Sequence, residues 1–163
     1  MRFSIRTFII FLLAPLFFVP QTAYADISIT VIGNWSGTID KNDLLSGAGS
    51  DLQSTYTSAS GQVSIDIRNV RGINDAWRID IRKVDNNWSN NLHPYVMRIS
   101  DGKGGNVSGG TSYQEVTDIN TPFFSGSGMV KGINIQLRLT GASIQIRPSS
   151  YSTVLYYTVV DIQ

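Results

Sequence analysis

The sequence predicts an all-β protein, built as a single antiparallel β-sandwich of immunoglobulin-like or jelly-roll type. Apolar and polar residues alternate in several segments, with the period of two that marks a strand with one buried face. Turn signals recur about every ten residues between these segments. No segment shows the apolar spacing of an amphipathic helix. Together these observations predict about eight to ten short strands.

The N-terminal residues have the features of a secretory signal peptide. Two arginines precede an apolar run at 7–19, and residues 23–25 form the small-x-small site that a signal peptidase accepts. An uncleaved anchor helix is the alternative, but the run is shorter than the about 20 apolar residues of a bilayer span. We therefore expect residues 1–25 to be removed on export, leaving residues 26–163 as one β-sandwich domain.

The composition restricts both the compartment and the chemistry. The chain has 13 basic and 12 acidic residues, and cleavage removes two of the basic ones, which leaves a net charge of −1. This charge argues against a nucleic-acid or anionic-membrane partner, and no second apolar segment is long enough to span a membrane. The absence of cysteine excludes a disulfide framework and cysteine-ligated metals. We expect a secreted, cofactor-free protein of a bacterial periplasm, cell surface or extracellular space.

Strands of the N-terminal half are expected where β-branched or aromatic residues alternate with polar ones. These strands lie at 27–32, 35–39, 52–56, 63–68 and 77–82. The last two should form a hairpin around a turn at 72–75, or face each other across the sandwich. Glycine, aspartate and serine predict a loop at 40–50, with one helical turn at Leu44 and Leu45.

Strands of the C-terminal half are expected at 95–99, 112–119, 133–139, 144–146 and 153–160. Polar or glycine-rich residues predict loops at 85–94 and 101–110, and no strand is assigned to 121–128, which ends in small residues. Tyr151 follows a break at Pro148 and stands at the entry to the last strand. At that position it can form a tyrosine corner, in which its hydroxyl hydrogen-bonds to the backbone.

No arrangement of residues predicts catalysis. The single histidine, His93, precedes Pro94, and we interpret it as a surface-loop residue and not as part of a Ser-His-Asp triad. Glu115 lies three residues before Asp118, and positions three apart in a strand face opposite sides, which suits glycoside hydrolysis poorly. We therefore expect no enzymatic activity and assign no catalytic, cofactor-binding or metal residues.

The glycine-rich stretch 101–110 is not a phosphate-binding loop, because it lacks a Gly-Lys-Ser/Thr ending and no helix follows it. Asp101 and Asn106 carry oxygen atoms of the kind that calcium prefers. A calcium site therefore stays open as an alternative, although the pattern favours a plain hairpin loop.

The tryptophans differ in their expected roles. Trp35 and Trp77 are in phase with the apolar residues of their strands, which predicts core positions. Trp88 lies among asparagines in a polar loop, where its ring can stack on a sugar while Asn87 and Asn90 hydrogen-bond to hydroxyl groups. The alternative is that Trp88 folds over the edge of the core. Candidate ligand-binding residues are therefore Trp88, Asn87 and Asn90.

Both ends of the predicted domain carry a family resemblance. A strand at 26–32 directly follows the signal peptide, and Pro148–Tyr151 precedes a threonine-containing last strand at 153–160. This single all-β layout resembles the fimbrial subunits of bacterial cell surfaces, which polymerise by strand exchange. The resemblance implies a pilin-like sandwich whose first strand inserts into a neighbouring subunit. The implied anchors are Ile27, Ile29 and Val31.

The chain also departs from that family. It lacks the disulfide of many pilins and the aromatic residue next to the C-terminus. The alternative for the first strand is that it pairs within its own domain.

Three functions therefore remain open. The first is a structural or adhesive cell-surface protein of fimbria-like type, and it leads because much of the chain predicts β-structure and nothing supplies chemistry. The second is a secreted carbohydrate-binding module that uses Trp88 and neighbouring Asn and Asp residues. The third is a small hydrolase that uses Glu115 or His93. The expected partners are further copies of the chain, other envelope proteins or glycans.

Overall fold

The computed structural model describes residues 26–162 and confirms the predicted antiparallel all-β fold. The predicted signal peptide, residues 1–25, lies outside the described residues. Every ladder between the described strands is antiparallel. In chain order the elements are β1 (Ser28–Ile32), the 3-10 helix η1 (Lys41–Asp43), β2 (Thr55–Thr57), β3 (Val63–Arg68), β4 (Ala76–Asn87), β5 (His93–Arg98), β6 (Lys103–Gly109), β7 (Gln114–Glu115), β8 (Thr121–Thr140) and β9 (Ser152–Asp161). The described part of the chain has no helix of the length and apolarity needed to cross a membrane.

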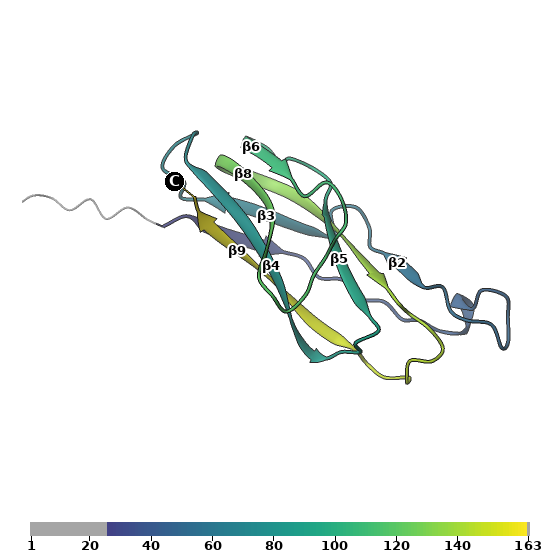
Figure 1. The fold of residues 1–163 in the computed structure, drawn as a ribbon. Coiled ribbons are helices and arrows are strands. Elements are labelled where there is room, and N and C mark those ends of the chain that lie inside the picture. The colour runs from purple at the N-terminus through teal and green to yellow at the C-terminus, as the bar shows by residue number, and fades with distance from the viewer. Residues whose placement is uncertain (1–25, 163) are drawn as a thin grey trace, which may run out of the picture.

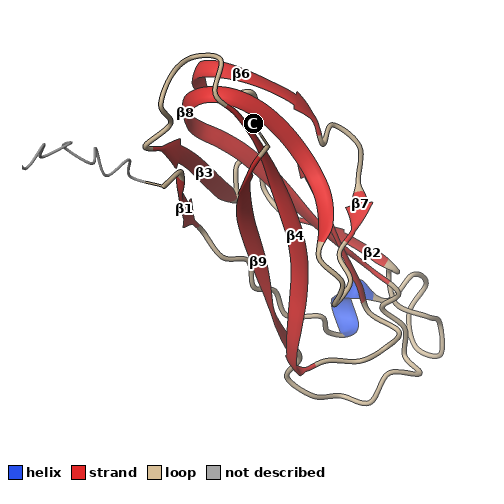
Figure 2. Ribbon diagram, turned by 60° about the vertical axis from the view of Figure 1, so that its left-hand side comes forward, coloured by secondary structure: helices blue, strands red, loops and turns tan. Residues whose placement is uncertain are grey.

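The long strand β8 organises the sheet (Figure 1). One edge of β8 pairs in succession with β2, β3 and β4, and the other edge pairs with β5 and β6. Outside these, β1 pairs with β3, β9 with β4, and β7 with β5. Because strands of this length twist strongly, the sheet curls until β1 and β9 come into contact, and it is nearly closed (Figure 2).

The core lies inside this curled sheet. Ile65 and Ile67 of β3, Ile79 of β4, and Ile133 and Ile135 of β8 are fully buried, as the alternation predicted. Burying such a side chain contributes about 1.5–3 kcal/mol relative to leaving it exposed. The inner face of β9 is only partly buried against the same core.

Trp77 is the centre of the core, and it explains the small residues of β8. Its side chain is fully buried, its ring packs edge-on against Phe124 with centroids 6.1 Å apart, and its indole nitrogen donates to the Gly128 carbonyl at 2.8 Å. A Cβ at Gly126 would lie 2.6 Å from the Trp77 ring. The ring therefore lies directly on the backbone of β8, which only glycine permits at that position.

One segment predicted as a loop, and one to which no strand was assigned, are strands. Residues 121–128 form the first part of β8, and 103–109 form β6 beside it. The backbones approach so closely that a Cβ at Gly105 would collide with the carbonyl oxygen of Ser127. Small residues here reflect close packing and not a flexible loop.

Two predicted strands do not form. Residues 35–39 join no ladder, although Trp35 packs against the core as expected. Residues 144–146 are part of a turn, because the Asp51 carboxylate accepts from the Ile144 amide at 2.9 Å and from the Ser143 hydroxyl at 3.2 Å. These local side-chain hydrogen bonds replace the ladder that the alternation predicted.

Five boundaries, positions or pairings also differ from the predictions. β3 and β4 form no hairpin, since both pair with β8. β4 continues to Asn87 because its polar end pairs with β9. Of the expected strand 112–119, only residues 114–115 join a ladder. Near the expected strand 52–56, the ladder is formed by residues 55–57. The helical turn expected at Leu44 and Leu45 lies earlier, at Lys41–Asp43 (η1), because Asp40 caps it there, and Leu44 is already extended.

Candidate functional site

A shallow hollow of about 290 Å3 lies between the end of β4, the start of β5 and the segment after β7. It brings together side chains that are far apart in the sequence. The polar and aromatic residues that line it are Lys83, Trp88, Asn90, His93, Glu115, Thr117 and Asp118. Two of the three predicted ligand-binding residues, and all three candidates weighed for catalysis, therefore line one surface depression.

Trp88 both closes its own loop and lines the hollow. Its indole nitrogen donates to the Leu92 carbonyl at 2.7 Å, and the Leu92 amide donates to the Ser89 carbonyl at 3.0 Å, so the ring closes the loop between β4 and β5. The side chain is half-buried and also lines the hollow. The Lys83 ammonium lies 6.0 Å from the centroid of its ring.

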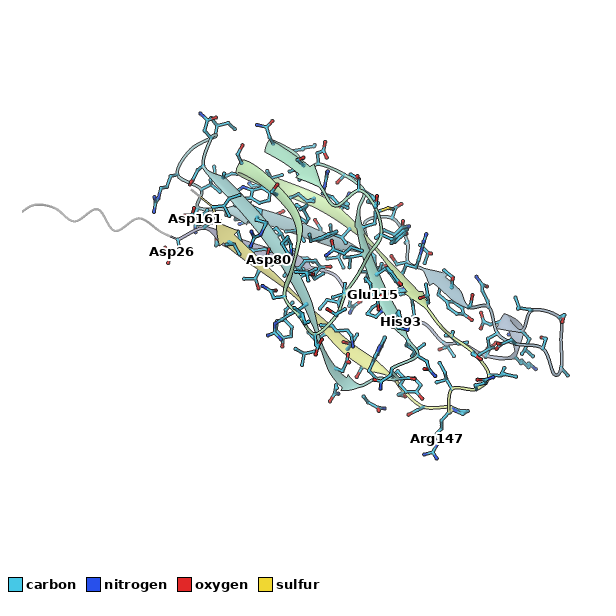
Figure 3. The ribbon with its side chains drawn as sticks, in the orientation of Figure 1. Asp26, Asp80, His93, Glu115, Arg147 and Asp161 are labelled. Atoms are coloured by element: carbon cyan, nitrogen blue, oxygen red, sulfur yellow. The ribbon has the colours of Figure 1, made fainter. Side chains whose placement is uncertain are left out.

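His93 and Glu115 point toward one another from β5 and β7 (Figure 3). His93 Nδ1 lies 2.6 Å from Glu115 Oε1, and the Tyr95 hydroxyl donates to Glu115 Oε2 at 3.4 Å. The ladder between β5 and β7, which pairs Tyr95 with Glu115, creates this contact across 22 positions of sequence. His93 is thus the first residue of a strand and not a loop residue. Among the described residues, no hydroxyl hydrogen-bonds to its ring.

Asp118 is the free acceptor of the hollow. It was expected to face away from Glu115 along one strand, and this expectation is wrong because β7 ends at Glu115 and the chain then turns. The Lys83 amide donates to the Thr117 carbonyl at 2.7 Å, which holds the turn against β4. Within the described residues, Asp118 has no hydrogen-bond or ion-pair partner.

Lys83 was not expected at a site, because nothing in its local sequence sets it apart. Its ammonium pairs with Asp85, which also accepts from the Thr153 hydroxyl at 2.8 Å. Partial burial opposes ionisation of Asp85, but the hydrogen bonds from Lys83 and Thr153 outweigh it and lower the pKa of this carboxyl. The ion pair leaves the Lys83 ammonium near the face of Trp88.

Asn87 lies outside the hollow. It is the last residue of β4, and its amide donates to the Ser150 carbonyl at 2.5 Å, in the connection between β8 and β9. Asn87 therefore supports the connection between β8 and β9 and does not line the hollow with Trp88 and Asn90.

The stretch 101–110 does not gather calcium ligands. Asp101 pairs with the buried Arg98, while Asn106 lies within β6 opposite Ser127. A second, more open hollow of about 450 Å3 lies beside Asp101 and is also lined by Lys103 and Lys131. Residues 26–162 contain no group of three or more His, Asp or Glu side chains that could hold a metal ion.

The predicted exchange strand β1 is paired with β3 of its own domain, with Ile29 opposite Ile67 and Val31 opposite Ile65. Ile27 and Ile29 pack against the core, whereas Val31 is 41% exposed. Exchange with a second chain therefore remains a prediction.

The predicted tyrosine corner is confirmed. The Tyr151 hydroxyl donates to the Arg147 carbonyl at 2.6 Å, which closes the turn before β9. This contact is local, four residues apart, and the sequence pattern was enough to predict it.

Comparisons of the chain with models of protein families, with curated proteins and with solved structures found no match.

Proposed function

We propose that this protein is an exported adhesive β-sandwich protein of the bacterial cell surface, and that the hollow beside Trp88 binds a carbohydrate. The observation that carries the proposal is the composition of the hollow. An aromatic ring, an amide, a free carboxylate and an ammonium group converge there on one concave surface. A sugar presents an apolar C–H face to an aromatic ring and hydroxyl groups to polar side chains, and binding sites combine such groups.

The partners of these groups decide which of them are available to a ligand. Glu115 is engaged by His93 and Tyr95, so its position is set in advance. Asp118 has no partner among the described residues and is the best placed acceptor for sugar hydroxyls. The volume, about 290 Å3, is at the lower end for a ligand site. We therefore expect one sugar residue to be held, as at the end or branch of a glycan.

The test is glycan-array screening followed by calorimetric titration of any glycan that binds. Asp118→Asn keeps the shape of the side chain and should weaken binding about tenfold, because it removes the charge from a hydrogen bond worth about 1.5–3 kcal/mol. Trp88→Phe should retain part of the affinity, and Trp88→Ala should lose it. Ile119→Ala is the matched control, since Ile119 is 68% exposed next to Asp118 and does not line the hollow. Absence of glycan binding by the parent protein would refute the proposal.

Fimbria-like assembly by strand pairing is a second candidate, and the position of β1 favours it. This strand begins the described chain, forms its only ladder with β3, and places Ile27 and Ile29 on the core. The same strand from a neighbour would make identical contacts, so exchange changes connectivity without loss of packing.

Assembly by β1 predicts polymers that grow with protein concentration and disappear when residues 26–32 are deleted. A synthetic peptide of residues 26–32 should cap the polymers of the parent protein and rescue the deleted protein as a monomer. Polymers that survive the deletion would contradict exchange through β1.

A further inference from the structure

β9 is a long edge strand with one unpaired side. It pairs with β4 from Trp77 opposite Asp161 to Asn87 opposite Ser152, and among the described residues it joins no second ladder. In an antiparallel ladder the backbone groups of alternate residues point away from the partner strand. β9 contacts β1 at the place where the sheet comes close to closing, but no ladder joins these two strands of the described chain. No backbone hydrogen bond joins the segment 33–40 to β9 within residues 26–162.

Three other edge strands, β2, β6 and β7, carry features that prevent edge-to-edge association, while the edge strand β1 lies in contact with β9. β6 has Lys103 and an irregular register between Gly104 and Asn106, and β2 and β7 are only three and two residues long. Short length, lysine and bulges are the usual protections of an edge. β9 has ten residues and contains no proline, no glycine and no charged residue before Asp161. It is the long edge without such protection.

The outer face beside this edge is also apolar. Val154 and Tyr156 are 52% and 45% exposed, and Val84 of β4, opposite Val154, is 41% exposed. The Arg82 guanidinium lies 4.9 Å from the centroid of the Tyr156 ring, and Tyr156 stays 45% exposed beside it. A strand added to this edge would bring its own side chains against Val154 and Tyr156.

We propose that β9 is a self-association interface, in which it pairs antiparallel with β9 of a second copy around a two-fold axis. A single strand is complementary to its own copy in this arrangement, because the two-fold axis pairs each residue with its symmetric counterpart. The result is a continuous sheet through β4 and β9 of both copies, with the Val154 and Tyr156 side chains of the two copies in contact. The association ends at a dimer, unlike exchange of β1, and it leaves the hollow beside Trp88 open.

Sedimentation velocity on the purified protein tests the proposal. An edge-to-edge contact buries less than the roughly 1,600 Å2 of a standard interface, so we expect weak association. The protein concentration should therefore be varied from about 1 µM to about 1 mM. The parent should change from monomer to dimer in this range. Val154→Lys adds the charge that protected edges carry and should weaken dimerisation by about tenfold or more. Ile119→Lys, the same kind of change at an exposed apolar residue outside the strands, should dimerise like the parent.

Engineered cysteines provide a second measurement that does not depend on weakening the interface, because the native chain has no cysteine. Single cysteines at Val154, Tyr156 and Thr158 are oxidised alone and in mixed pairs. At least one combination should form disulfide-linked dimers, since facing residues of antiparallel strands have Cα atoms about 4.5–5.5 Å apart, within the range of a disulfide. Ile119→Cys should form none at the same concentration.

Three results would overturn the proposal. The first is a parent protein that stays monomeric at the highest concentration. The second is equal dimerisation of Val154→Lys and Ile119→Lys. The third is association that is lost on deletion of residues 26–32 but kept in Val154→Lys, which would assign it to exchange of β1. Failure of glycan binding leaves this proposal unaffected, because the hollow and the β9 edge share no residue.

Discussion

A methyl group added at Gly126 should destabilise the whole sandwich, because it would enter the contact between the Trp77 ring and β8. The new Cβ would lie 2.6 Å from two ring carbons of Trp77 and also against the carbonyl oxygen of Asn106 in β6. Carbon atoms pack best at about 3.5–4.0 Å. The ring, or one of the two strands, would therefore have to move by about 1 Å.

The size of the effect follows from what holds Trp77 in place. The side chain is fully buried, and its indole nitrogen donates to the Gly128 carbonyl at 2.8 Å. Overpacking a core site costs about 1–3 kcal/mol. A buried donor that loses its acceptor costs about 1–3 kcal/mol more. Gly126→Ala should thus lower the free energy of unfolding by about 2–6 kcal/mol, a large part of the 5–15 kcal/mol typical of a domain.

Urea unfolding followed by tryptophan fluorescence measures this difference. Gly37→Ala is the matched control, because no atom lies within 4 Å of its added Cβ and its backbone does not have a positive φ. The control should be unchanged or up to about 1 kcal/mol more stable. If the two variants differed by less than about 1 kcal/mol, the packing of Trp77 on Gly126 would be refuted.

Three further predictions concern single polar groups. Tyr151→Phe should lower stability by about 0.5–1.5 kcal/mol in urea unfolding, because it removes the hydrogen bond to Arg147; no change would mean that the corner does not hold the turn. Tyr157→Phe should leave stability unchanged or raise it by about 1 kcal/mol, since the Tyr157 hydroxyl is buried, has no partner among the described residues, and has its pKa raised by burial. Clear destabilisation would show that this hydroxyl is hydrogen-bonded. Hydrogen bonds from Arg68 and from the Gly132 amide lower the pKa of Asp66. The stabilisation of the folded state by Asp66 is therefore fully present above about pH 4, the pKa of this carboxyl in the unfolded chain. It is lost as the pH falls through the lower pKa that Asp66 has in the folded protein. The stability gap between the parent and Asp66→Asn should narrow below about pH 4, and a gap independent of pH would contradict this assignment.

The candidate site could be predicted only in part. Trp88 and Asn90 stood out because an aromatic residue among asparagines is unusual in a loop, and both line the hollow. The pairing of His93 with Glu115 was not predictable, because it depends on which strand lies beside β5. Asp118 was rejected on the assumption that a strand continued past Glu115. That assumption failed because ladder length depends on the partner strand and not on local alternation.

Local pattern by itself determined the all-β class, most of the strands with one buried face, and the tyrosine corner. In those strands the side-chain period records burial directly, and the corner joins residues four apart. Tertiary structure decided the rest. Glycines 105 and 126, typical of loops by composition, lie in strands because close approach of β6, β8 and Trp77 leaves no room for a Cβ. The twisting of β8 placed β9 at an open edge and brought the hollow together from separate strands. Such contacts depend on the space between elements, and a linear pattern contains no measure of that space.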